Sequence, residues 1–287
     1  MALTDYAAFL AHNLAAKIYP FVKVSTATTS GLAWASYWTT AADAGAAPTT
    51  AAALSGASVG ALCVQPVLNA TTNTQYISQV DWLPRIASTA EWAENGYLLY
   101  DRLSHQGGLD GTVTTEQTTN LPTAALTRYT DGVGVMAALE IYTQIGSTAT
   151  TATINYTNQA GTAARTSKAI VFGGTNRRNV TCFLMFPLQD ADTGVRSVEG
   201  VTLAASTLTA GAFGVTLFKP LIFLPFATAA SASSCVPHLN MMIGGGFSMP
   251  ALQGTPCLAV LRAGMNTDAN VLAVSGVIGA VKIIEVA

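Results

Sequence analysis

The sequence contains few charged residues. Asp, Glu, Lys and Arg together make up 10% of the 287 residues, whereas soluble domains typically carry about 25%. Apolar residues account for 50% of the chain, and the mean hydropathy is +0.40. A lone monomer with this surface would be poorly solubilised. The composition therefore indicates either a membrane protein or a subunit whose surface is covered by neighbouring proteins.

The chain lacks an uninterrupted apolar segment long enough to cross a bilayer. A spanning helix needs about 20 mostly apolar residues, but residues 212–226 are interrupted by Lys219 and by two prolines. Residues 271–286 include Lys282 and are expected to form strands. We therefore predict no membrane association, which leaves protein neighbours as the explanation for the missing charge.

Neither sign of charge dominates. The 13 Lys and Arg residues nearly balance the 15 Asp and Glu residues, and no basic cluster is larger than Arg177-Arg178. Because binding to a nucleic-acid backbone requires clustered cations, no nucleic-acid partner is expected. The N-terminus also lacks the basic region of a secretory signal, and His12 and Asn13 interrupt its first apolar stretch.

Cysteines are few and widely spaced, unlike those of a small disulfide-stapled domain. We interpret them as mostly buried thiols, and one or two disulfides are the alternative. The four are Cys63, Cys182, Cys235 and Cys257.

The clearest helix pattern covers residues 3–18 and ends before Pro20. Its apolar stripe must be covered by the rest of the chain or by a neighbouring subunit. Residues 25–61 are rich in Ala, Thr, Ser and Gly, and they predict a second helix at Thr49–Val59 or an extended arm on another molecule. The residues expected to make assembly contacts are Tyr6, Phe9, Leu10, Leu14, Trp34 and Trp38.

After Cys63 the chain changes to short apolar or alternating runs, which predict a mainly β fold. Thr150–Asn158 is the clearest example, since apolar residues alternate with Thr and Asn. We expect a β-sandwich or jelly-roll-like body over residues 93–287. Residues 1–92 are expected to form the N-terminal helix, the arm and an assembly-contact region, and a soft boundary falls at Val80–Ala93.

Four residues could form a hydrolytic site: His105 with Asp101 and Asp110, and Ser104 as the nucleophile. However, no nucleophile-elbow pattern surrounds the serine. The segment resembles a strand that runs into a polar, Gly-rich loop, so a structural role is favoured and we predict no enzymatic activity.

Cofactor and metal signals are equally incomplete. Cys235 and His238, with Cys257, could ligate zinc, but a second ligand cluster is missing and a turn fits as well. Gly173-Gly174 and Gly244–Gly246 lack the residues that follow a phosphate-binding loop and are interpreted as turns. No cofactor is predicted, and Arg177-Arg178 is interpreted as a loop pair or an intersubunit ion-pair donor.

Two aromatic clusters could stack on carbohydrate, although core or interface packing is the favoured interpretation. The clusters are Trp34/Tyr37/Trp38 and Trp82/Trp92/Tyr97/Tyr100.

Between Tyr100 and Phe226 short stretches of the sequence resemble structural proteins of tailed bacteriophages. The stretches that carry this resemblance are Tyr100–Leu109, Leu126–Thr130, Glu140–Ile145, Tyr156–Gly161 and Gly194–Val198. The resemblance transfers no functional residue, and a major capsid protein is a poorer match because the long charged helix expected at its spine is absent.

The resemblance implies a virion component that is assembled in the host cytoplasm. A head decoration or capsid-stabilising subunit is the first hypothesis; it would bind copies of itself and the major capsid protein as a homo-oligomer. The alternatives are a tail or fibre component and a carbohydrate-binding module that recognises the host surface.

Overall fold

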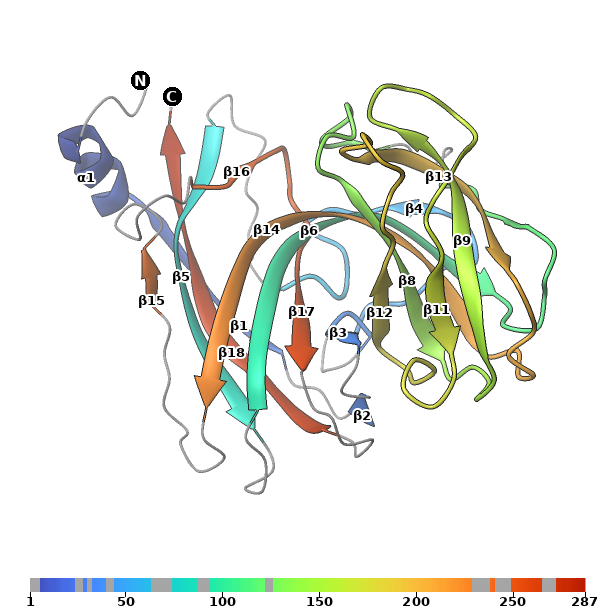
Figure 1. The fold of residues 1–287 in the computed structure, drawn as a ribbon. Helices are drawn as coiled ribbons and strands as arrows, with labels where there is room; N and C mark the ends of the chain where they lie inside the picture. Colours follow the sequence, from blue (N-terminus) through green and yellow to red (C-terminus); the bar gives the residue numbers. More distant parts are fainter. Residues whose placement is uncertain are drawn as a thin grey trace.

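The structure of the chain is a computed structural model that describes residues 6–23, 28–29, 33–39, 44–62, 74–86, 93–121, 126–228, 238–240, 249–264 and 272–286. Within these residues the chain is mainly β and has one short helix, α1 (Tyr6–Leu14). The strands form three sheets, and a central sheet lies between the other two (Figure 1). The mainly β fold predicted from the sequence is confirmed.

The central sheet closes on itself. Its strands pair antiparallel in the order β14, β8, β12, β3, β17 and β6, and β6 pairs again with β14. The two longest, β6 and β14, have 17 residues each and curve together across the molecule (Figure 1). The short strand β4 (Ala52–Ala53) adds to β6. The six strands of the ring are β3 (Trp34–Ser36), β6 (Ala93–Leu109), β8 (Met136–Thr143), β12 (Cys182–Met185), β14 (Ala212–Thr228) and β17 (Leu258–Gly264).

Two further sheets flank this closed sheet. One has the order β10, β9, β13 and β7, with β11 also on β9. Its strands are β7 (Gln117–Thr118), β9 (Ala149–Asn158), β10 (Arg165–Thr166), β11 (Ile170–Gly173) and β13 (Val195–Leu203). The other has the order β1, β18, β5 and β15, with β16 on β5 and β2 on β18. Its strands are β1 (Lys17–Lys23), β2 (Thr28–Thr29), β5 (Thr74–Ile86), β15 (His238–Asn240), β16 (Ala251–Leu252) and β18 (Leu272–Val286).

Side-chain alternation along the ring strands separates three apolar cores. On β8, Leu139 packs in the core shared with the five-stranded sheet, whereas its neighbour Ala138 packs in a different cluster. On β6, Leu99 packs against the six-stranded sheet, whereas Tyr100 joins the cluster of Ala138. Because successive strand residues point to opposite faces, the cluster that contains Tyr100 and Ala138 lies inside the closed sheet.

Strand β9 shows why the threonine-rich sequence folds this way. Ala152, Ile154 and Tyr156 are buried, and the alternating Thr and Asn residues face outward. Each buried large side chain stabilises the fold by about 1.5–3 kcal/mol, and β-branched threonines keep the outer face wettable without charge. The alternation predicted for Thr150–Asn158 is therefore confirmed.

The predicted division at residue 92 does not match the strand pairing. β3 lies in the ring between β12 and β17, and β1 and β5 flank the C-terminal strand β18. The soft boundary predicted at Val80–Ala93 begins inside β5. Residues before 93 thus supply strands to two of the three sheets.

Two helix predictions need correction. Within the described residues the first helix spans Tyr6–Leu14 and ends four residues before the predicted end at Ile18. Ile18 and Pro20 lie in β1, an edge strand of the described sheet, where a missing N–H is tolerated. Residues 49–59 are not helical. They contain β4, and the Leu54 N–H donates to the Leu103 carbonyl at 2.9 Å. Backbone pairing with β6 has outweighed the helix propensity of the alanines. No helix in the described segments has the length and apolarity needed to span a membrane.

Candidate functional site

A cluster of polar side chains lies inside the closed sheet, and Arg102 of β6 is at its centre. The Arg102 guanidinium pairs with the carboxylate of Glu140 on β8, with 2.5 Å between Nη2 and Oε2, and both side chains are fully buried. The hydroxyls of Thr216 and Tyr142 donate to the same Oε2 at 2.9 and 3.1 Å. The acid is thus held by three donors, which compensate part of the cost of burying its charge.

An aromatic lid covers the other side of this arginine. The Arg102 Cζ lies 4.4 Å from the centre of the Trp38 ring, and Trp38 packs edge-to-face on His105 at 5.5 Å. The Trp38 indole N–H donates to the Ala46 carbonyl, and a Cβ at Gly45 would lie 2.2 Å from the indole. Only glycine at position 45 therefore lets the loop close over the tryptophan.

The geometry fixes the protonation state of His105. Arg102 Nη2 lies 2.9 Å from His105 Nδ1. Arginine can only donate, so Nδ1 must accept and the ring is neutral with its proton on Nε2. Burial, reinforced by the charge of Arg102, lowers the pKa of His105 to about 2. The cluster therefore carries one positive and one negative charge, and the histidine adds none.

The alternative of a hydrolytic site, which the sequence disfavoured, is not supported by the positions of its residues. His105 contacts Arg102 rather than an aspartate, and Asp101 is engaged elsewhere by Arg128. Asp110 accepts bonds from Thr112 in its own turn. A general base must reach the proton of its nucleophile and be held by an orienting group, and these side chains do neither. His105 is also only 2% exposed.

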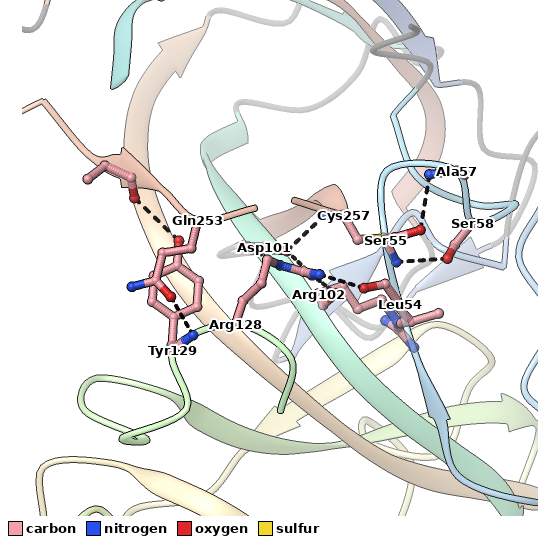
Figure 2. A network of polar contacts seen from close by, with 11 residues as sticks. Leu54, Ser55, Ala57, Ser58, Asp101, Arg102, Arg128, Tyr129, Gln253 and Cys257 are labelled. Atoms are coloured by element: carbon pink, nitrogen blue, oxygen red, sulfur yellow. Dashed lines mark hydrogen bonds and ion pairs between the residues drawn. The ribbon is translucent and has the colours of Figure 1, made fainter. Parts of the chain in front are cut away.

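Asp101 instead belongs to a second buried network, shown in Figure 2. Arg128 pairs with it in a bidentate way, at 2.8 Å from Nε to Oδ2 and 2.7 Å from Nη2 to Oδ1. The same guanidinium donates to the carbonyls of Leu54 at 2.7 Å and Arg102 at 3.2 Å. The Cys257 N–H donates to Asp101 Oδ1 at 2.8 Å. Four segments distant in sequence thus meet at the Asp101–Arg128 ion pair.

The loop that carries Arg128 is held at a second point. The Tyr129 N–H donates to Gln253 Oε1 at 2.6 Å, and its hydroxyl donates to the Ala251 carbonyl at 3.3 Å (Figure 2). Tyr129 has a φ of 50°, a strained conformation for a residue with a side chain. These bonds offset that strain and lock the 126–130 loop to the strand connections around it.

Some atoms of the ring cluster have no hydrogen-bond partner within the described residues. They are Glu140 Oε1 and Arg102 Nε. Both residues are fully buried, so solvent cannot reach them from outside. The cluster therefore resembles a buried ion-pair network that specifies packing rather than a site open to a substrate.

The described residues contain no group of three side chains suited to holding a metal ion. Cys257 is a buried free thiol, and burial raises its pKa to about 12. Cys182 is also free and buried, so the interpretation of these two as buried thiols is confirmed. Cys63, Cys235, Gly244–Gly246 and the side chain of His238 lie outside the described residues. Gly173 and Gly174 both have positive φ, as the predicted turn requires.

The residues predicted to make assembly contacts are placed in different environments. Leu10 and Leu14 are 43% and 81% exposed on α1. Phe9 packs inside the chain against β18, and Trp38 is sealed in the ring, so both differ from the exposed contacts that the sequence suggests. Trp34 is half-buried, and the Tyr6 side chain lies outside the described residues. Their role in assembly stays a prediction.

The sequence did not point to an apolar surface that the structure places on β1 and β18. Ile18 and Val22 are 63% and 53% exposed, and Val22 lies directly opposite the 45% exposed Ile278. β1 is an edge strand among the described residues. In the sequence Tyr19 and Phe21 alternate with Ile18 and Val22, so both faces of this strand are apolar; this could have indicated the surface, but residues up to Ile18 were assigned to a helix. Comparisons of the chain with models of protein families, with curated proteins and with solved structures found no match.

Proposed function

We propose that the chain is a structural subunit of a bacteriophage virion that binds copies of itself and the major capsid protein. In this role it decorates and stabilises the head of the particle. This role would use a β-sandwich or jelly-roll-like body, because layered sheets expose broad faces and strand edges to neighbours. The phage assignment rests on the resemblance of short sequence stretches, within residues Tyr100 to Phe226, to phage structural proteins.

The observation that carries the assembly role is the apolar edge at β1. We name the face formed by Ile18, Val22 and Ile278 the β1 surface. Large apolar side chains, each about half exposed or more, lie together there, and β1 has no partner strand on its outer side in the part of the chain that the structure describes. Such an edge favours pairing with another chain unless charges or coverage prevent it. Burial of these side chains by a neighbouring subunit would stabilise the contact by about 25 cal/mol per Å² of apolar surface.

The low charge supports the same proposal. An interface built from apolar burial and backbone hydrogen bonds contains few ion pairs to be screened. Dissociation from the particle is therefore expected to change little between low and moderate ionic strength. A steep rise in dissociation over that range would contradict the proposed interface.

The direct test places a charge in the β1 surface. Val22→Glu should prevent incorporation into particles, because an unpaired carboxylate would be buried against a neighbour, yet the monomer should keep its stability since the side chain faces solvent. Leu208→Glu is the matched control, because Leu208 is 76% exposed on the loop after β13. Incorporation is measured by co-sedimentation of each variant with particles. Normal incorporation of Val22→Glu would contradict the proposal.

A second function is favoured by one pair of aromatic rings. Trp34 is half-buried and packs edge-to-face on Phe223 at 6.0 Å, and Phe223 is 50% exposed. Partly exposed aromatic faces are suited to stacking on sugars, which fits the alternative of host-surface recognition. Specific glycan binding by the isolated chain that is lost in Trp34→Ala would favour this function over decoration. Trp92 and the side chain of Trp82 lie outside the described residues.

A further inference from the structure

A surface hollow of about 350 Å³ lies among β3, β11, β12 and the turn that follows β11. The side chains of its lining residues are apolar except for that of Arg177. Trp34, Val171 and Met185 are among the apolar residues that line it. The volume falls within the range of sites that bind small groups or a few side chains.

Arg177 has no partner for its charge within the described residues. Its side chain makes no hydrogen bond or ion pair there, and only its carbonyl is engaged, by the Gly173 N–H at 3.2 Å. By contrast, Arg102, Arg128 and Arg165 each pair with a carboxylate. A guanidinium is built for bidentate pairing with a carboxylate, so Arg177 offers an unused anion contact at the wall of an apolar hollow.

A strand edge borders the same hollow. β11 pairs with β9 and with no other strand in the part of the chain that the structure describes. Its residues Ile170 and Val171 line the hollow. An edge strand can add an extended segment from another chain through backbone hydrogen bonds, while pockets beside it select the side chains of that segment.

We propose that this hollow binds an extended segment of a partner protein that presents an apolar side chain next to a carboxylate. The segment pairs with β11 beside Val171, on the edge that carries no other strand among the described residues; its apolar side chain packs against Trp34 and Met185, and its carboxylate pairs with Arg177. Charge complementarity selects the acid, and the open strand edge selects an extended peptide. The site is separate from the β1 surface, so it stands or fails independently of the virion role.

Peptide binding to the full chain tests this site. Two fluorescein-labelled peptides, Thr-Val-Thr-Leu-Glu-Thr-amide and the same sequence with Gln for Glu, are titrated by fluorescence polarisation. The Glu peptide should bind about tenfold more tightly than the Gln peptide, as expected for one charge-assisted pair. Arg177→Gln should remove this difference. Arg178→Gln, the same loss of charge one residue away and outside the lining, should preserve it.

A second variant adds charge to the hollow without affecting the core, because Val171 is 45% exposed. Val171→Asp should weaken binding of the Glu peptide more than that of the Gln peptide, whereas Val171→Lys should do the reverse. Far-UV circular dichroism checks that each variant is folded. Equal affinity of the two peptides, no saturable binding of either, or loss of the preference in Arg178→Gln would overturn the proposal.

Discussion

Removal of the buried acid inside the ring should be far more damaging than removal of an acid at the surface. In Glu140→Ala, the Arg102 guanidinium stays fully buried without its counter-charge, and the hydroxyls of Thr216 and Tyr142 lose their acceptor. Breaking a buried pair by removing one partner costs about 3–5 kcal/mol of folding free energy. Asp190→Ala is the control: Asp190 and its partner Lys168 are both exposed, so its removal should change the stability little.

The same reasoning predicts that removing both charges is less harmful than removing one. The double variant Arg102→Met, Glu140→Leu leaves no uncompensated charge, and a buried ion pair replaced by apolar residues of similar size is often neutral or stabilising. The orphaned hydroxyls and His105 Nδ1 would still cost about 1–3 kcal/mol. We therefore expect the free energy of unfolding of the double variant to lie within about 3 kcal/mol of that of the natural chain and to exceed that of the single Glu140→Ala variant.

Urea unfolding, followed by tryptophan fluorescence and by far-UV circular dichroism, measures these differences. Trp38 packs on Arg102 and reports directly on the cluster. If Glu140→Ala lowered the free energy of unfolding by less than about 1 kcal/mol, the reasoning would be refuted, because a buried unpaired guanidinium should destabilise the fold by more than that. A double variant less stable than Glu140→Ala would refute it as well.

Two further predictions concern the polar networks. Because the pKa of His105 falls from its ordinary value of 6.5 to about 2 in the folded chain, only the unfolded chain takes up its proton below pH 6.5, so stability should decrease on acidification. The free energy of unfolding should fall by about 2 kcal/mol between pH 6.5 and 5. His105→Asn keeps an acceptor for Arg102 and should not show this pH-dependent fall when urea unfolding is measured at each pH. If the variant had the same pH dependence as the natural chain, the neutral buried ring would be contradicted. Arg128→Ala should lower the free energy of unfolding by about 3–5 kcal/mol, because it leaves Asp101 buried without its counter-charge. It should also raise the hydrogen-exchange rate of the 126–130 loop; unaltered exchange would show that Arg128 does not hold that loop.

Local pattern was enough to predict most strands of the later chain. Alternation predicted Thr150–Asn158, and the structure has Ala149–Asn158. The N-terminal segments were harder, because Ala-rich stretches favour helix locally while their actual partners lie more than 50 residues away. β4 pairs with β6, and β3 pairs with β12 and β17. Ring closure depends on such long-range pairs, which leave no local signal.

The candidate site was predicted only in its residues and not in its roles. The sequence drew attention to Asp101, Ser104 and His105 as neighbours, but a bulged strand sends neighbouring side chains to different networks. Arg102 and Arg128, which organise those networks, gave no sequence signal, because isolated arginines in a charge-poor chain resemble surface residues.

The proposed role as a head decoration subunit is tested most directly by quantitative mass spectrometry of purified particles. The measurement is the copy number of this chain relative to the major shell protein. The account predicts that the chain is a particle component whose copy number is of the same order as that of the shell protein. Its absence from particles would contradict the virion role, and a copy number far below that of the shell protein would contradict head decoration.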